Sequence, residues 1–182
     1  GNLLLNRWKV LRNLGKALLQ INQKATLNIY TPDVPPKHIL KSLSKVSSIR
    51  YGGRLTKDEL ECRLKKCEYV VHVEAFDKKN RKITRLSMST KISEYVACGA
   101  KILAIGPSDV ASMKCISDNN LGIWIYNPSV KKITERINRE ITVEDYERNA
   151  TEFIKKCASE SNGTRIKKYI TDAVTYCRNE NV

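Results

Sequence analysis

The spacing of apolar residues at the start of the chain predicts a helix followed by a short buried strand. One face of that helix carries five residues at helical spacing: Leu4, Trp8, Leu11, Gly15 and Leu18. The apolar run over 26–31 is typical of a buried strand. Prolines at 32, 35 and 36 then break the chain, and a short helix is expected over 38–45.

Strand and helix patterns continue to alternate along the rest of the chain. Strands are expected over 48–51, 69–73, 101–105 and 121–126, with 69–73 in the centre of the sheet. Helices are expected from Thr56, as its cap, to Lys66, from Lys91 to Gly99, after Pro107, and from 130 to about 178. Residues 77–87 are rich in Lys and Arg and are expected to form a loop. This alternation predicts one α/β domain, a Rossmann-like three-layer sandwich with a mostly parallel sheet and a helical C-terminal extension.

Positive charge is concentrated in the first half of the chain. The formal net charge is +14, and residues 1–101 contribute +13 of it, from 21 Lys and Arg against 8 Asp and Glu. Three kinds of partner fit such an excess: a small anionic ligand, an anionic membrane surface or nucleic acid. Nucleic acid is disfavoured, because only 7% of the residues are aromatic and few can stack on bases.

The six cysteines form no C-x-x-C pair, which argues against a zinc site and against a redox motif. His38 and His72 stand apart from each other and from any cysteine cluster, so no metal site is expected. No apolar run approaches the roughly 20 residues that span a bilayer, and no signal-peptide pattern opens the chain. We therefore expect a cytoplasmic protein with reduced thiols.

The segment 87–104 carries the most specific pattern in the sequence. A polar stretch leads into a short helix with Lys91 and Glu94 on one face and an apolar face opposite; Gly99 ends it, and a buried strand follows. A hydroxyl of Ser89 or Thr90 is expected to cap the helix. A helix start beside a lysine favours an anion, and a carboxylate one turn further on can accept hydrogen bonds from sugar hydroxyls.

This pattern, S-T-K-I-S-E-Y-V-A-C-G-A-K-I-L-A, resembles the donor-binding segment of GT-B glycosyltransferases. More narrowly, it resembles the C-terminal lobe of the glycosyltransferase group 1 class. The start of the chain fits as well, because in that family a loop after a first strand precedes an arginine and a helix, as Gly1, Asn2, Leu3 and Arg7 do here. The resemblance implies a lobe that binds a nucleotide-diphospho-sugar and needs no metal or other cofactor.

The resemblance also implies roles for individual residues. Arg7 and Lys91 would bind the diphosphate, Ser89 and Thr90 would add donors, and Glu94 would hold the ribose. Asn2 and Leu3 would lie in the substrate-binding loop. The turn Gly52-Gly53-Arg54-Leu55 resembles the family's nucleobase site, which would place Gly53 and Leu55 beside the base. A plain turn fits those residues equally well.

One position departs from the family pattern. The commonest form of the motif has a second glutamate eight residues before Glu94, near the transferred sugar, and this chain has Leu86 there. The identity of the sugar, and activity itself, therefore depend on other groups. The catalytic residues are not identified by the sequence.

We thus expect the donor-binding lobe of a glycosyltransferase that transfers a sugar to a glycan or lipid-linked acceptor, with peripheral contact at the inner face of a membrane. An N-terminal acceptor lobe of the same protein is expected as its partner, so the chain is expected to be a fragment that is inactive alone. The alternative is a non-catalytic nucleotide-binding or basic anion-binding α/β module, and an epimerase of the same fold also stays open.

Overall fold

The computed structural model describes residues 3–139 and 146–158, in which strands and helices alternate. The strands are β1 (Leu27–Tyr30), β2 (Ile49–Gly53), β3 (Val70–Val73), β4 (Ile102–Ile105) and β5 (Gly122–Ile125). The helices are α1 (Arg7–Ile21), α2 (Lys37–Leu43), α3 (Lys57–Lys66), α4 (Lys78–Thr84), α5 (Lys91–Ala97), α6 (Ala111–Asp118), α7 (Val130–Asn138) and α8 (Tyr146–Ala158). The predicted α/β alternation is confirmed. The predicted helix from 130 to 178 is seen as α7 and α8, and residues 159–178 lie outside the described residues.

All described strand pairs are parallel, and their hydrogen bonds divide them into two ladders. β1 pairs with β2, and β3, β4 and β5 pair in that order, with Val70 opposite Ile102 and Ile102 opposite Gly122. The prediction that strand 69–73 is central is therefore wrong, because β3 lies at the edge of its ladder and β4 at the centre. The reason is visible in β4, whose four residues are all buried, whereas β3 alternates buried with partly exposed positions.

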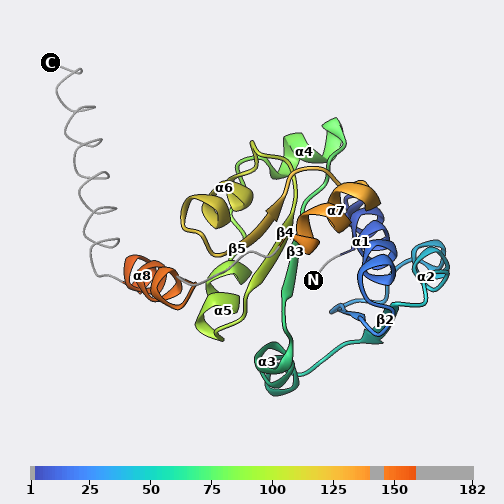
Figure 1. The fold of residues 1–182 in the computed structure, drawn as a ribbon, viewed down its shortest axis with the longest axis horizontal. Coiled ribbons are helices and arrows are strands. Elements are labelled where there is room, and N and C mark those ends of the chain that lie inside the picture. The colour runs from blue at the N-terminus through green and yellow to red at the C-terminus, as the bar shows by residue number, and fades with distance from the viewer. Residues whose placement is uncertain (1–2, 140–145, 159–182) are drawn as a thin grey trace, which may run out of the picture.

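Helices cover both faces of the three-stranded ladder, as Figure 1 shows. Leu103 and Ile105 of β4 pack in one cluster with Leu14 of α1 and Ile133 of α7. Ile102 and Ala104 point to the other face, because side chains alternate along a strand, and they pack with residues of α5, α6 and α8. These are the three layers that the sequence predicts.

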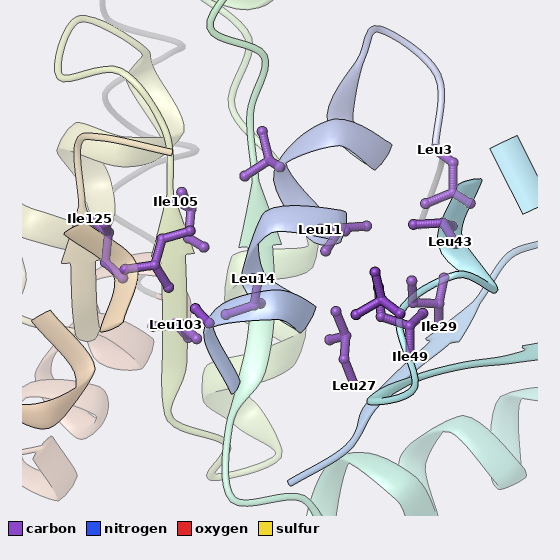
Figure 2. Packing of buried hydrophobic residues seen from close by; sticks show 14 of the residues in the cluster. Leu3, Leu11, Leu14, Leu27, Ile29, Leu43, Ile49, Leu103, Ile105 and Ile125 are labelled. Atoms are coloured by element: carbon purple, nitrogen blue, oxygen red, sulfur yellow. The ribbon is translucent and has the colours of Figure 1, made fainter. Parts of the chain in front are cut away.

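α1 joins the two ladders through the larger core. Figure 2 shows Leu14 beside Leu103, while Leu27, Ile29 and Ile49 of the first ladder lie on the opposite side of α1. Leu14 is fully buried at the middle of this cluster. Side-chain packing on α1, rather than a shared hydrogen-bond ladder, therefore holds β1 and β2 to the rest of the domain.

The start of α1 differs from the prediction. Leu5 and Asn6 both adopt positive φ angles, of 57° and 61°, and this turn precedes the helix. Leu4 is therefore outside α1 and 52% exposed, while its neighbour Leu3 is buried in the core. Trp8, Leu11, Gly15 and Leu18 do lie on α1 as predicted.

The predicted loop over 77–87 is also wrong in part, because it contains α4. The Asp77 side chain accepts a hydrogen bond from the backbone N–H of Asn80 at 3.1 Å, which caps this helix. Thr56 forms the predicted cap of α3, and with Glu59 it makes a reciprocal capping box. None of the described helices is long and apolar enough to cross a membrane.

Candidate functional site

The carboxyl end of β3 meets the first turn of α1. Glu74 follows β3 directly, and one of its carboxylate oxygens accepts a hydrogen bond from the Arg7 guanidinium at 2.7 Å. The Glu74 side chain is 4% exposed and that of Arg7 is 21% exposed. Asn6 is the residue before Arg7, and its side-chain amide donates to the Asp77 carboxylate at 3.0 Å. In open α/β sheets, ligands bind outside the carboxyl ends of the strands, which is the edge that these contacts build.

His72 lies beneath this ion pair and is neutral at physiological pH. Its Nε2 atom is 3.5 Å from the second Glu74 oxygen, buried, and without a hydrogen-bond partner among the described residues. Burial, together with the positive charges of Arg7 and Lys91, lowers the pKa of His72 to about 4. The nearby Glu74 carboxylate does not reverse this shift, because Arg7 already neutralises it.

The positive charge of Lys91, like that of Arg7, contributes to the low pKa of His72. Lys91 opens α5, and its side chain is exposed, as is that of Glu94 one turn later. Ile92 and Val96 bury the opposite face, and Gly99 ends the segment with a φ of 72°. The amphipathic helix predicted around Lys91 and Glu94 is confirmed.

The buried face of α5 packs against the rest of the domain. Ile92 and Val96 pack in one cluster with Tyr146 and Phe153 of α8 and with Met113 of α6. The Tyr146 hydroxyl donates to the Ala100 carbonyl at 2.5 Å, just after α5 ends. Burial raises the pKa of this phenol to about 12, so it stays a donor. The exposed face of α5 is thus held in a defined place.

The predicted hydroxyl cap of α5 is wrong. Thr90 has helical backbone angles, and its side chain makes no capping hydrogen bond. The Ile92 N–H instead donates to the Ser89 carbonyl at 3.2 Å, and the Ser89 N–H donates to the Ser112 hydroxyl at 3.1 Å. A turn anchored on α6, rather than a side-chain cap, therefore starts this seven-residue helix.

The other predicted site residues are spread more widely. Gly53 ends β2 with a φ of 73°, and Leu55 is half-buried in the segment between β2 and α3. Leu3 packs its side chain into the core. Asn2 lies outside the described residues. The structure thus places Arg7 at the carboxyl end of β3, and Lys91 and Glu94 together on one short helix.

The basic segment before α5 is partly tied down. Arg81 pairs with Asp109 at 2.7 Å, and the Ala111 N–H donates to the Arg85 carbonyl at 2.8 Å. Lys78, Lys79 and Lys82 remain exposed on α4. Leu86, which replaces the glutamate of the family pattern, is 82% exposed. In the described part of the chain no cluster of three or more His, Cys, Asp or Glu could hold a metal ion.

Glu74 is the residue of this site that the sequence reasoning missed. The signal that could have found it is its position, since it comes directly after the buried strand β3 on the carboxyl side. A carboxylate in that place needs a cation when it is buried, and Arg7 supplies it from a segment 67 residues away. Sequence spacing alone gives no sign of that contact.

Comparison with known proteins gives two matches. The family described as "Glucosyltransferase 3-like, C-terminal domain" matches residues 12–173. Among solved structures, the chain is similar to WaaG, described as a glycosyltransferase involved in lipopolysaccharide biosynthesis, with a TM-score of 0.56 and 18% sequence identity. That match covers 85% of this chain and 40% of WaaG, and it confirms the predicted fold class. No curated protein matches the chain.

Proposed function

The chain belongs to the glucosyltransferase 3-like C-terminal domain family, and we propose that it is the lobe of a glycosyltransferase that binds a nucleotide-diphospho-sugar donor. The family membership confirms the resemblance to a C-terminal glycosyltransferase lobe that residues 87–104 carry. The donor, the acceptor and the residues that bind them are parts of the proposal.

The observation that carries the proposal is the convergence of Arg7 and Lys91 on the carboxyl end of β3. Their charges act on the same buried histidine, and Glu74 is the carboxylate that faces them there. Arg7 pairs with Glu74, whereas no ion pair of Lys91 is found among the described residues, so the Lys91 charge is available to a diphosphate. Lys91 is exposed and takes the phosphate oxygens first, while Arg7 keeps Glu74 and shares its remaining donors. Fixed positive charge at this place also stabilises the diphosphate as it leaves.

The remaining proposed contacts follow from the same orientation. Glu94 is exposed on the same side of α5 as Lys91, so it can accept hydrogen bonds from the ribose hydroxyls. The Thr90 hydroxyl makes no cap, and with Ser89 it can donate to the phosphates. Gly53 and Leu55 would lie beside the base, and the backbone of Asn2 and Leu3 beside the sugar. No cofactor other than the donor is required.

The acceptor side of the reaction belongs to a larger protein. We propose a glycan or lipid-linked acceptor bound by an N-terminal lobe, and peripheral contact of the whole enzyme with the inner face of a membrane. The 182-residue chain alone would then bind the donor and transfer no sugar. The charge of +14 supports the membrane contact, and each Lys or Arg near an anionic surface contributes about 1 kcal/mol.

Calorimetric titration of the chain with UDP, GDP and the corresponding nucleosides tests the site. Lys91→Ala should weaken the diphosphates more than the nucleosides, because it removes the charge that meets phosphate. Glu94→Ala should weaken both, by about 1.5–3 kcal/mol if a charged hydrogen bond to the ribose is lost. Lys114→Ala removes an equally exposed helical lysine from α6 and should change neither.

The proposal fails if the wild-type chain binds neither nucleotide at millimolar concentration. It also fails if Lys91→Ala and Glu94→Ala both bind like Lys114→Ala.

A further inference from the structure

A basic groove lies between α1 and α2, away from the site at β3. It has a volume of about 360 Å³, and its walls carry the cations of Arg12, Lys16, Lys41 and Lys45, with His38 and Ser42 between them. None of these residues belongs to the proposed donor site. Figure 1 shows α2 and α5 on opposite sides of the molecule, separated by α1 and the three-stranded ladder.

The four cations of the groove come as two pairs on two facing segments, and the members of each pair are four residues apart in the sequence. Arg12 and Lys16 are four residues apart on α1, so they lie on one face of it. Lys41 lies in the last turn of α2, and Lys45 follows four residues later, just past the end of that helix. α1 and α2 are neighbours, so the two pairs of cations face each other across the groove.

The wall around Arg12 is held in place by several contacts. The Arg12 Nη1 atom donates to the Ser42 hydroxyl at 3.1 Å, and the guanidinium lies 5.5 Å from the centre of the Trp8 ring. Trp8 in turn meets the His38 ring edge-on at 6.4 Å. The Arg12 Nε atom is buried and has no hydrogen-bond partner in the described part of the chain. The guanidinium is therefore held in place between Ser42 and Trp8.

The charges of the groove are not neutralised by the protein. No Asp or Glu lines it, and none of the ion pairs found between described residues includes any of its four cations. Arg12 and Lys16 repel each other at four-residue spacing on α1, and the charges of Lys41 and Lys45 face them. A solvated basic surface spreads its charge outward, whereas this arrangement concentrates it in a concave site, where the field is strongest.

We propose that this groove binds a phosphate group that carries more than one negative charge, such as a phosphomonoester or a diphosphate. Phosphate fits because a guanidinium offers parallel N–H donors to two of its oxygens, and the lysines add point charges around it. The ligand is either the headgroup of an anionic lipid or a soluble phosphate compound. A nucleic acid fits less well, because the residues that line the groove include no Phe, Tyr or Trp that could stack on a base.

The test compares two double variants of the 182-residue chain that lose the same charge. Lys16→Gln/Lys45→Gln removes one exposed lysine from each wall of the groove, and Lys66→Gln/Lys114→Gln removes two exposed lysines from α3 and α6. The probes are inorganic pyrophosphate, followed by calorimetry, and vesicles of phosphatidylcholine with or without 30% phosphatidic acid, whose headgroup is a phosphomonoester, followed by flotation at low salt. A single-stranded DNA oligonucleotide is the third probe.

We expect the groove variant to lose at least about tenfold in affinity for pyrophosphate or for the anionic vesicles, since two charges near the phosphate are removed. The control variant should stay within about twofold of wild type. Loss for the vesicles alone identifies a lipid headgroup, and loss for pyrophosphate identifies a soluble ligand. Equal losses in both variants, no binding of wild type to pyrophosphate or to the anionic vesicles, or groove-dependent binding to the oligonucleotide alone would each overturn the proposal. Pyrophosphate can also bind at the proposed donor site, so both double variants and their reference chain carry Lys91→Ala in the calorimetry, and the two proposals therefore fail separately.

Discussion

The ion pair between Arg7 and Glu74 should make a large contribution to the stability of the fold, and Arg7→Met is the change that measures it. Methionine keeps an unbranched stem and suits a helix, so the variant removes the guanidinium with its charge and its hydrogen bonds to Glu74. The Glu74 carboxylate then stays behind with 4% of its side chain exposed. Its closest remaining partner is the neutral ring of His72, 3.5 Å away.

The magnitude follows from the burial of the two partners. Breaking a buried pair by removing one member costs about 3–5 kcal/mol, because the other charge is left without compensation. Arg7 is 21% exposed, so water can enter where its guanidinium was and solvate part of the Glu74 charge. We therefore expect the lower end of that range, about 3 kcal/mol, at pH 7.

The loss should also depend on pH, and this separates the ion pair from simple packing. The Arg7 charge is one of the causes that hold the pKa of His72 low, so removing it raises that pKa. Protonated His72 can then pair with Glu74 in place of Arg7. The destabilisation by Arg7→Met should consequently be smaller at pH 5 than at pH 7.

Urea unfolding followed by circular dichroism measures both effects. A shift of the urea midpoint reports a change of stability as long as the dependence of the unfolding free energy on urea concentration stays the same. Lys65→Met is the matched control, because Lys65 pairs with Glu61 at the same 2.7 Å distance on the exposed surface of α3. That variant should leave the midpoint unchanged, since exposed pairs contribute little. If Arg7→Met shifts the midpoint no more than Lys65→Met does, the assignment of Glu74 as a buried charge dependent on Arg7 is wrong.

Two further predictions concern His72 and Gly122. The folded pKa of His72 is about 4 and its ordinary value is 6.5, so the unfolded chain takes up a proton first and the free energy of unfolding should fall by about 3 kcal/mol as the pH falls through this interval. His72→Gln should lack this part of the pH dependence in urea unfolding at pH 7 and pH 4; an unchanged pH dependence contradicts the assignment. Gly122 has a φ of 151°, and an added Cβ would lie 1.9 Å from the Ile102 carbonyl oxygen, so Gly122→Ala should destabilise by more than about 3 kcal/mol or prevent folding. Gly99 has a φ of 72° but open space around its Cβ position, so Gly99→Ala should lower the free energy of unfolding by only about 1–2 kcal/mol in thermal unfolding. Equal losses for the two glycine variants would refute the clash at Gly122.

Local patterns predicted the elements whose signals are contained within one segment. Thr56 and Glu59 are three residues apart, so the cap of α3 can be read directly, and the four apolar residues of β4 sit between a glycine and a proline. α5 was predicted for the same reason, because Ile92 and Val96 share a face at helical spacing. In these cases burial and local preference agree.

The errors have two sources: local backbone features that the apolar spacing does not show, and contacts with distant segments. α4 was missed because its run of Lys and Arg suggested a solvated loop, whereas Asp77 starts a helix that Arg81 ties to Asp109. Leu4 was placed on α1 because the positive φ angles at Leu5 and Asn6 leave no mark in the apolar spacing. The order of strands in the ladder, and the contact between Arg7 and Glu74, depend on which segments meet in space.

α3 connects the two ladders, and none of its residues is buried. The segments on either side of it are held together elsewhere, by the packing of α1 against α7 and by the core around Leu14. The core therefore does not depend on an unbroken chain at α3. A cut or an inserted domain at this helix would leave two pieces that still share a core, which makes α3 the natural place to attach a reporter or to divide the protein for fragment complementation.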